Sequence, residues 1–438
     1  MALAIATPCV QASIYETNDL QRANLVSVER WTDATERGLR LDKDAGEVVI
    51  LAEFCGIAPS ATIEFPIVGE LSDRDYEALF RTFAVPSAIG RAIEALGVPR
   101  GRNTSYSAMD FWPKGHRVTI DVTPFATTNA VWRPIQDYII DMTARAPMPF
   151  DSFVYCGSFD VDDSVPGARF CDTEAPNSVF SNYNEPQTLI DLPAKLGQSE
   201  VYGRFVLAPE SDLVPFGLYR LRIRPEAETA HRLVSLDLHI LKTGEDVSYR
   251  LLGKQSGCAD TAFADPQSFA AHLKSLVSSN ADVFASLHFD VGLTVSEAAR
   301  QAQFLSKLEG EKGIRIEGPG EDQIFCRGFL PDEIWRVRKN RPSQPWEIRF
   351  ARTDGGSVRM TLVQTIEDWT STDSLDPILS TKEFAAATPA EAAEIVTREG
   401  DGLPVLLAFA PGDMALKEIM PALLALKPTH PTIYVFAE

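Results

Sequence analysis

Three aspartates close together are the best candidates for metal chemistry in this chain. Asp160, Asp162 and Asp163 lie in the run Gly157–Arg169, which has the composition of a loop. Calcium prefers several carboxylate and carbonyl oxygens, and such a loop can supply them. The spacing differs from that of an EF-hand, which needs further ligands and a bidentate Glu. The segment therefore predicts either a calcium site or a solvated acidic loop, and the sequence indicates no other cofactor.

Six cysteines could form three disulfides, and the chain has them at Cys9, Cys55, Cys156, Cys171, Cys258 and Cys326. Cys156 and Cys171 are the closest pair in sequence, and a crosslink between them would tie down the loop that separates them. Cys258 with Cys326 and Cys9 with Cys55 follow by elimination. The alternative is six buried thiols in a cytosolic protein, because free cysteine packs as a small hydrophobe.

The histidines and the short motifs give little support for catalysis. The six histidines, His116, His231, His239, His272, His288 and His430, form no HExxH motif and no close pair in sequence. We expect His288 to be a hydrogen-bonded histidine within a strand. The sequence has no GxSxG nucleophile elbow, no Walker A motif and no Gly-rich dinucleotide loop. Gly318-Pro319-Gly320 is interpreted as a turn.

A basic, aromatic segment stands out in this acidic chain as a candidate partner-binding site. Its members lie between residues 327 and 341 and are Arg327, Trp335, Arg336, Arg338, Lys339 and Arg341. Such a segment could contact an acidic partner or a glycan. Alternatively, it pairs with acidic faces of its own chain or is solvated.

The polar run Ser181–Pro186 has two interpretations. Asn, Tyr and Glu side chains are typical of sugar or peptide contacts. They are equally typical of a turn, because Asn bonds its own backbone and Pro186 restricts the residue before it.

The composition excludes some classes of function. The chain has 438 residues, of which 45% are hydrophobic, enough to build several cores. Its net charge is −20, from 61 acidic and 41 basic residues. This charge argues against a general nucleic-acid binder and against adsorption to anionic lipid. No apolar run reaches the ~18 residues that a membrane-spanning helix needs.

The N-terminus leaves the compartment open. The sequence MALAIATPCVQA has no basic region and too short an apolar run for a signal peptide. Either the chain is cytosolic, or an export signal has been replaced.

Strands dominate the first half of the chain. Residues 1–36 are weakly patterned and are interpreted as an N-terminal extension. From residue 37 to 228, predicted strands such as Arg117–Val122 alternate apolar and polar residues, and residues 85–96 predict one amphipathic helix. The pattern is that of an α+β domain.

An internal repeat follows, in residues 229–318 and 345–438, with residues 319–344 as the basic linker. Each copy predicts the order ββαβαβ. Asp265, Thr294 and Thr388 are expected helix N-caps, and Glu297 and Glu391 have capping-box spacing. The predicted fold class is therefore α+β and multidomain: a strand-rich N-terminal domain and two small ββαβαβ repeats.

The N-terminal domain resembles the YdjY-like domain, a family of bacterial cell-envelope contexts without an established activity. The stretches that carry the resemblance are GLRLDKDAGEVVILAEF, IEFPIV, YEALFRTFAVPSAIGRAIEALGVPRG, FVYCGS and VFSNYNEPQTLIDLP. The family commonly has His-Glu-Ser after its first strands. This chain has Asp75-Tyr76-Glu77-Ala78 there, so no role of that His is expected here.

Each C-terminal copy resembles the periplasmic domain of the ExbD/TolR family. The matching stretches are DVFASLHFDVGLTVSEAARQAQFLSKLEGEKGIRIEG and LPVLLAFAPGDMALKEIMPALLALKPTHPTIYVF. The family's membrane helix, with its proton-carrying Asp, is absent from this sequence, so the chain is not expected to be a stator subunit. Domains of this family tend to dimerise, which implies an intramolecular pseudo-dimer of the two repeats.

Taken together, these features predict a periplasmic or secreted, non-enzymatic binding or scaffold protein. It would dock envelope proteins or cell-wall polymer, with no nucleic acid and no membrane span. The alternative is a hydrolase or metal-dependent enzyme with its site in the YdjY-like domain, and a cytoplasmic location stays open.

Overall fold

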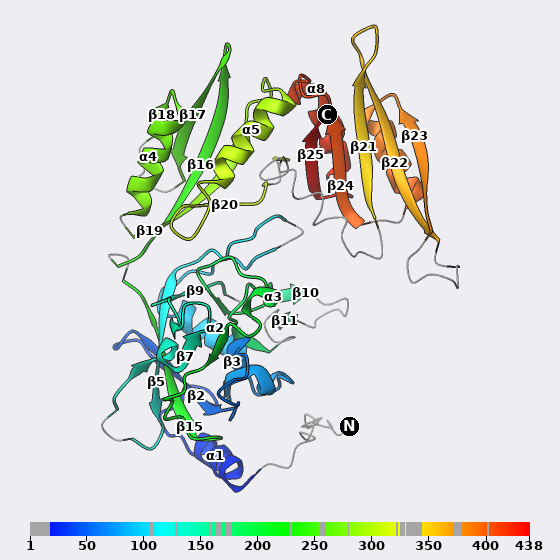
Figure 1. The fold of residues 1–438 in the computed structure, drawn as a ribbon. Helices are drawn as coiled ribbons and strands as arrows, with labels where there is room; N and C mark the ends of the chain where they lie inside the picture. Colours follow the sequence, from blue (N-terminus) through cyan, green and yellow to red (C-terminus); the bar gives the residue numbers. More distant parts are fainter. Residues whose placement is uncertain are drawn as a thin grey trace, which may run out of the picture.

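The computed structural model of the chain shows three packed units, each built on its own sheet (Figure 1). Among the described residues, no helix is long and apolar enough to cross a membrane. The structure describes residues 18–105, 108–127, 130–157, 160–162, 169–171, 177–227, 230–254, 260–278, 280–320, 323–324, 329, 344–368, 370, 378–400 and 403–438, with the backbone alone for 160–162, 169–171 and 403.

Eight strands of the first unit close into a ring. Their order is β2-β15-β5-β9-β13-β12-β3-β4, and β4 pairs back onto β2. Closure removes the two free edges that an open sheet of these strands would have. The ring strands are β2 (Glu47–Phe54), β3 (Phe65–Gly69), β4 (Ala78–Thr82), β5 (Arg117–Pro124), β9 (Phe153–Tyr155), β12 (Ser178–Phe180), β13 (Ile190–Asp191) and β15 (Leu218–Pro225).

Short elements complete the first unit. β1 and β6 extend the ring at β2 and β5, while β14, β7 and β8 form a separate small sheet. Their bounds are β1 (Leu39–Asp42), η1 (Asp75–Glu77), β6 (Arg133–Pro134), η2 (Ile135–Tyr138), β7 (Ile139–Asp141), β8 (Ala146–Pro147), β10 (Asp160–Asp162), β11 (Arg169–Cys171), α3 (Gln198–Val201) and β14 (Phe205–Leu207).

Two helices pack on this unit. α2 (Pro86–Glu94) begins with proline at its first position and buries Ile89 and Ile93, which confirms the helix predicted for residues 85–96. α1 (Asp19–Glu29) lies in the segment that we interpreted as an extension. Its Asn24 amide donates to the buried Glu53 carboxylate at 3.0 Å, so the helix is fixed to β2.

The second and third units have the same sheet topology. Their strand orders are β18-β17-β16-β19-β20 and β23-β22-β21-β24-β25, with a three-stranded antiparallel meander followed by two parallel strands in each. The second unit comprises β16 (Arg232–Thr243), β17 (Asp246–Gly253), β18 (Thr261–Phe263), α4 (Pro266–Val277), β19 (Ala281–Phe289), α5 (Val295–Ser306) and β20 (Ile314–Ile316). The third comprises β21 (Pro345–Arg352), β22 (Val358–Asp368), β23 (Ile378–Ala386), α7 (Pro389–Glu399), β24 (Leu403–Ala410), α8 (Leu416–Leu426) and β25 (Thr432–Ala437).

The predicted order ββαβαβ is wrong by one strand in each unit. β18 and β23 lengthen the first hairpin to three strands, so the observed order is βββαβαβ. The predicted N-caps are confirmed: Asp265, Thr294 and Thr388 each accept a hydrogen bond from the first turn of α4, α5 and α7. The mixed α+β, multidomain class is also borne out.

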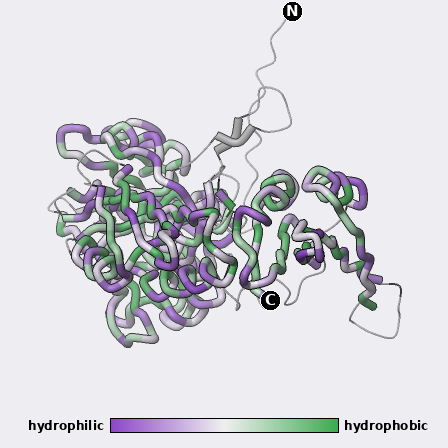
Figure 2. Tube along the Cα trace, turned by 90° about the horizontal axis from the view of Figure 1, so that it is seen from above, coloured by the Kyte–Doolittle hydropathy of each residue, from purple (hydrophilic) through white to green (hydrophobic). Residues whose placement is uncertain are grey.

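The second and third units pair through the start of one helix from each. Thr294 and Ala415, the N-cap residues of α5 and α8, form an antiparallel bridge. The Val295 amide donates to the Met414 carbonyl at 2.9 Å, and the Leu416 amide donates to the Leu293 carbonyl at 2.8 Å. These two bonds are equivalent under a pseudo-twofold rotation. One apolar core runs through both units, and Figure 2 shows apolar stretches in strands and helices throughout the molecule.

A buried carboxylate joins the first unit to the second. Asp282 on β19 accepts from Arg117 on β5 at 2.7 and 3.1 Å, and it also pairs with Arg315 on β20 at 2.5 Å. All three side chains are less than a tenth exposed. The Arg315 guanidinium lies 5.6 Å from the ring centre of Trp112, which the first unit supplies. The junction therefore depends on one anion between two cations.

Replacing Asp282 should separate this junction. Asp282→Ala leaves two arginines buried without their anion, which is expected to cost about 3–5 kcal/mol of unfolding free energy. Urea unfolding of the full chain measures it. Asp212→Ala is the matched control, because its partner Arg133 is on the surface and such pairs contribute less than about 1 kcal/mol. Equal losses in the two variants would contradict the assignment.

Candidate functional site

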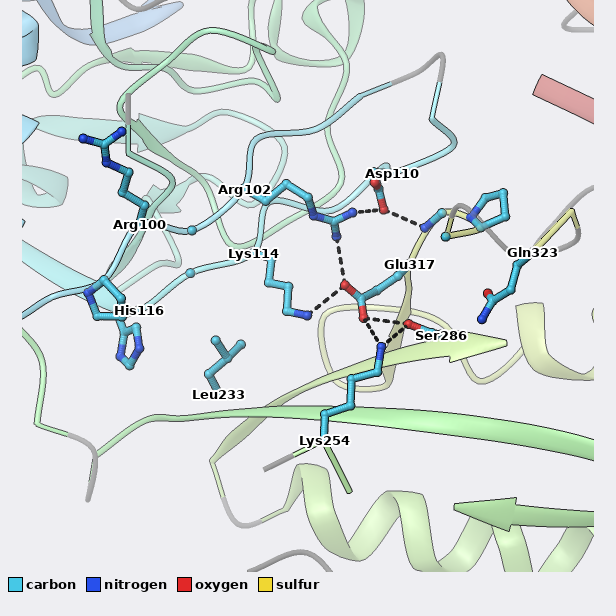
Figure 3. A pocket seen from close by; sticks show the side chains of 16 residues that line it. Arg100, Arg102, Asp110, Lys114, His116, Leu233, Lys254, Ser286, Glu317 and Gln323 are labelled. Atoms are coloured by element: carbon cyan, nitrogen blue, oxygen red, sulfur yellow. Dashed lines mark hydrogen bonds and ion pairs between the residues drawn. The ribbon is translucent and has the colours of Figure 1, made fainter. Parts of the chain in front are cut away.

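A cavity of about 600 Å³ lies between the first and second units (Figure 3). The first unit supplies the segment between α2 and β5, and the second unit supplies residues next to β17, in β19 and after β20. Its charged lining residues are Arg100, Arg102, Asp110, Lys114, Lys254 and Glu317. The cavity is thus built from segments that lie far apart in the sequence.

Glu317 lies at the centre of the charged groups of this cavity. Lys114 Nζ is 2.8 Å and Arg102 Nη2 is 3.3 Å from its Oε1. Its other oxygen, Oε2, accepts from the Ser286 hydroxyl at 3.1 Å and lies 3.9 Å from Lys254 Nζ. Burial opposes the charge of Glu317, but Lys114, Arg102 and Lys254 outweigh it and lower the pKa of this carboxyl.

Asp110 is a second carboxylate in the wall of the cavity. It pairs with Arg102 and accepts from the Gly318 amide at 2.6 Å. A methyl group on Gly318 would lie 1.9 Å from the carbonyl oxygen of Ala108, whereas one on Gly320 would meet nothing within 4 Å. Gly318 is therefore required by a close approach of two backbones, in addition to the turn that we predicted.

A second set of hydrogen bonds runs from the cavity along the sheet. Lys254 Nζ donates to Ser286 at 2.7 Å and lies 3.1 Å from Asp237, whose oxygen is 2.9 Å from His288 Nε2. Burial opposes the charge of Asp237, but the bonds from His288 and Lys254 lower its pKa overall. His288 also lies 2.9 Å from the Gln323 amide, so it is a hydrogen-bonded histidine in a strand, as predicted.

Ser286 and Lys254 are at hydrogen-bond distance, as in a serine–lysine pair. Lys254 also lies between two carboxylates, 3.1 Å from Asp237 and 3.9 Å from Glu317. The Ser286 hydroxyl donates to Glu317, so the serine, the lysine and both carboxylates form one connected set of polar groups. Groups of both charges are therefore held in place at the cavity.

The structure describes the predicted metal residues only in part. The backbone of Asp160–Asp162 forms β10, paired with β11, so these residues form a strand and not the loop that we expected. The side chains of Asp160 and Asp162, and Asp163 as a whole, lie outside the described residues. Within the part of the chain that the structure describes, no group of three His, Cys, Asp or Glu residues could hold a metal ion.

The disulfide predictions rest on residues that the structure leaves out. Cys9, Cys258 and Cys326 lie outside the described residues, as does the side chain of Cys171 on β11. Cys55 carries a thiol whose pKa is raised by burial. Cys156 is buried, with its sulfur 3.8 Å from the Val154 carbonyl oxygen. The three pairings stay predictions.

The two predicted binding segments differ in outcome. The basic segment Arg327, Trp335, Arg336, Arg338, Lys339 and Arg341 lies outside the described residues. The run Ser181–Glu185 is buried in the first unit. The Asn182 amide donates to the Ile63 carbonyl at 2.8 Å, and the Asn184 amide donates to Asp191 at 3.1 Å. These side chains are therefore bonded inside the fold and form no exposed sugar-binding surface.

Sequence reasoning missed the residues that the fold brings together. His239 and His288 face each other across β16 and β19, and their rings stack with centres 4.4 Å apart, although they are far apart in sequence. A prediction that β16 pairs with β19 in parallel would have placed these two histidines opposite each other. Lys114, Lys254 and Glu317 belong to no motif, so no local signal pointed to them.

Comparisons with known proteins give no family. No family model and no curated protein matches the chain. One solved structure, a Bacteroides thetaiotaomicron protein described as having an actin-like ATPase fold and unknown function, matches over 48% of this chain and 91% of its own. Its sequence identity is 8% and its TM-score is 0.14, so the match supports no conclusion about fold or function.

Gly318 and Gly320 form a matched pair for testing the cavity wall. Gly318→Ala forces apart two backbones and should cost about 1–3 kcal/mol of stability, as overpacking does. Gly320→Ala should change the urea midpoint little. Equal midpoints for both variants would show that the contact between Gly318 and Ala108 is loose.

The junction should weaken in acid. The pKa of Asp282, like that of Glu317, is lowered: burial opposes the charge, but Arg117 and Arg315 outweigh it. The ionised forms of both carboxyls therefore stabilise the fold above about pH 4, which is near their pKa in an unfolded chain. This stabilisation is lost as the pH falls through the lower pKa values of the folded state. Burial lowers the pKa of His231 beside Asp282, which acts in the same direction.

Hydrogen exchange of β5 and β20 at pH 7, 5 and 3 measures this loss. The protection factors of these strands, which are corrected for the intrinsic slowing of exchange in acid, should fall between pH 5 and 3 relative to those of the interior strand β24 of the third unit. Unchanged protection of β5 and β20 at pH 3 would contradict the linkage.

Proposed function

We propose that the chain is a non-enzymatic binding or scaffold protein of the cell envelope, which docks envelope proteins or cell-wall polymer. The observation that carries this proposal is a two-stranded arm on the third unit. β22 pairs with β21 only as far as Val363, but it pairs with β23 as far as Asp368. Residues 364–368 and 378–382 therefore extend beyond the rest of the sheet, toward the lower right of Figure 1.

The arm exposes apolar side chains on both of its faces. Ile366 is opposite Ser380 and Leu379 is opposite Glu367, so Ile366 and Leu379 lie on opposite faces. Ile366, Ile378 and Leu379 are 43%, 58% and 55% exposed. At the base of the arm, Lys382 pairs with Glu399 at the end of α7. A two-stranded ribbon is only marginally stable alone, and exposed apolar residues of this kind are typical of contact surfaces.

The outer edge of β23 gives the arm a means of docking. A strand at the edge of a sheet presents unpaired backbone groups, and an extended partner segment can add to them. The other units offer shorter edges. In the first unit the ring is closed, and the edge strands β1, β6, β8 and β14 have two to four residues each. The outer strands β18 and β20 of the second unit have three residues each. β23 has nine.

The envelope context of this proposal rests on the resemblances to YdjY-like and ExbD/TolR-like domains. The pseudo-twofold pairing of Thr294 with Ala415 supports the interpretation of the two C-terminal units as an intramolecular pseudo-dimer. A chain with three joined units and one projecting arm has the geometry of an adaptor.

Crosslinking in intact cells of the source organism, followed by capture of the chain and mass spectrometry, tests the proposal. The wild-type chain should capture envelope proteins. The double variant Ile378→Ser, Leu379→Ser should lose them while its stability changes by no more than about 0.5 kcal/mol, because both side chains are exposed.

Leu71→Ser is the matched control, since Leu71 is an exposed leucine of the first unit, and it should keep the partners. Capture of cytosolic proteins alone would overturn the proposal. If the arm variant retained the same partners, the arm would not be the docking surface.

A further inference from the structure

We propose that the outer face of the ring in the first unit, around β15, binds an extended acidic segment of a partner protein. This inference concerns a different surface from the arm of the third unit, and it holds whether or not the arm docks a partner. The surface carries four arginines, which we call the arginine face: Arg40 on β1, and Arg220, Arg222 and Arg224 on β15.

The alternation of β15 places three of these side chains on one side of the sheet. The odd-numbered positions 219, 221 and 223 are buried in the core of the first unit, so the three arginines project from the outer face. β15 lies between β2 and β5, and β1 extends the sheet beyond β2 (Figure 1). Arg40 lies in the same row as Arg222, because both are opposite Val49 of β2.

The arginine face holds more cations than carboxylates. Asp121 is shared, since it accepts from Arg222 at 2.8 Å and from Arg224 at 2.9 Å. Glu47 is also shared, at 2.9 Å from Arg40 and 3.8 Å from Arg222. Four guanidinium groups with two carboxylates leave a charge of +2, in a chain that carries −20.

Arg220 has no carboxylate partner among the residues that the structure describes. Its guanidinium donates to the Thr127 carbonyl at 2.8 Å and lies 5.8 Å from the ring centre of Trp132. Burial and the neighbouring charge of Arg40 both lower the pKa of Arg220. A carboxylate brought to this arginine would therefore meet a cation that the chain itself does not neutralise.

The hydrogen-bond donors of the face also outnumber its acceptors. Within the described part of the chain, the Nε atoms of Arg40, Arg220 and Arg224 are buried without an acceptor. Asp42 lies on the same side of β1, but its carboxylate accepts from the Ala45 amide at 2.9 Å. Even with Asp42 counted, the face keeps a charge of +1.

The depth of the charged groups determines which of them a partner meets first. The side chains of Asp121 and Glu47 are 11% and 12% exposed, whereas those of Arg222, Arg40 and Arg224 are 17%, 31% and 43% exposed. A partner therefore meets guanidinium groups before it meets carboxylates. A guanidinium can donate two parallel hydrogen bonds to a carboxylate, which makes such pairs strong.

An extended segment matches the spacing of the arginine face. Alternate side chains of an extended chain are about 7 Å apart, which is also the spacing of successive arginines on β15. Acidic residues at alternate positions of a partner can therefore each reach one arginine. The overall charge of −20 repels a large acidic body, so a narrow segment fits this surface better than an acidic globular face.

Fluorescence anisotropy of a labelled peptide that alternates Glu and Ser over about ten residues tests the proposal, with the full chain at pH 7. A peptide of the same length that alternates Gln and Ser is the neutral control. Inorganic polyphosphate, titrated separately, distinguishes phosphate from carboxylate. The Glu peptide should bind and the Gln peptide should not.

Two variants test the named residues. Arg220→Met should weaken the binding about fivefold, which is ~1 kcal/mol. Glu47→Gln should tighten it, because the variant removes a carboxylate that competes for Arg40, and a merely structural role would not produce tighter binding. The charge-matched controls are Arg398→Met in the third unit and Asp260→Asn in the second, both at exposed side chains, and each should change the affinity less than about twofold.

Several results would overturn the proposal. These are no change in anisotropy up to about 1 mM protein, equal binding of the Gln peptide, binding of polyphosphate alone, or equal affinities of Arg220→Met and Arg398→Met. Each variant is first checked for a wild-type urea midpoint. Arg224→Met, at an arginine that is 43% exposed, takes the place of a variant that unfolds early and should also weaken the binding.

Discussion

The arrangement of the first and second units depends on one buried negative charge. Taking Asp282 out of water costs several kcal/mol, and only the two arginines that flank it, one from each unit, offset that cost. Arg315 is equally dependent, because burial lowers its pKa and Asp282 keeps it charged. Neither unit can bury its own part of this set alone. The charges therefore permit one relative placement of the two units and penalise others.

The cavity is a consequence of that placement. The first unit brings cations to the junction at Arg102, Lys114 and Arg117, and the second brings carboxylates at Asp282 and Glu317. In the buried part, Asp282 lies between two arginines. In the more exposed part, each cation of the cavity lining has a carboxylate partner, and an open space remains beside the paired groups. The same electrostatic complementarity thus joins the two units on one side and frames a cavity beside the joint.

Local features of the sequence predicted local structure well. The N-caps Asp265, Thr294 and Thr388 were found because a capping residue bonds amides only two or three positions away. β18 was missed because three residues carry no readable alternation. β23 was missed because both of its faces are largely exposed, so it lacks the pattern that a buried face imposes.

Long-range features left no such trace. Ring closure depends on β2 pairing with both β4 and β15, and β15 is more than 160 residues away in the sequence. Glu317 meets Lys114 across about 200 residues, and nothing near either residue marks the contact. Gly318 is the exception, since the sequence placed this glycine in a predicted turn, although it did not show which backbone the glycine approaches.

The pairing of Thr294 with Ala415 has a consequence for how the protein behaves on dilution. Between separate chains, an interface of four backbone hydrogen bonds and an apolar contact would come apart at low concentration. Here both halves belong to one polypeptide, so each meets the other at an effective concentration that dilution of the protein does not change. The pair formed by the second and third units is therefore independent of how much protein the cell makes.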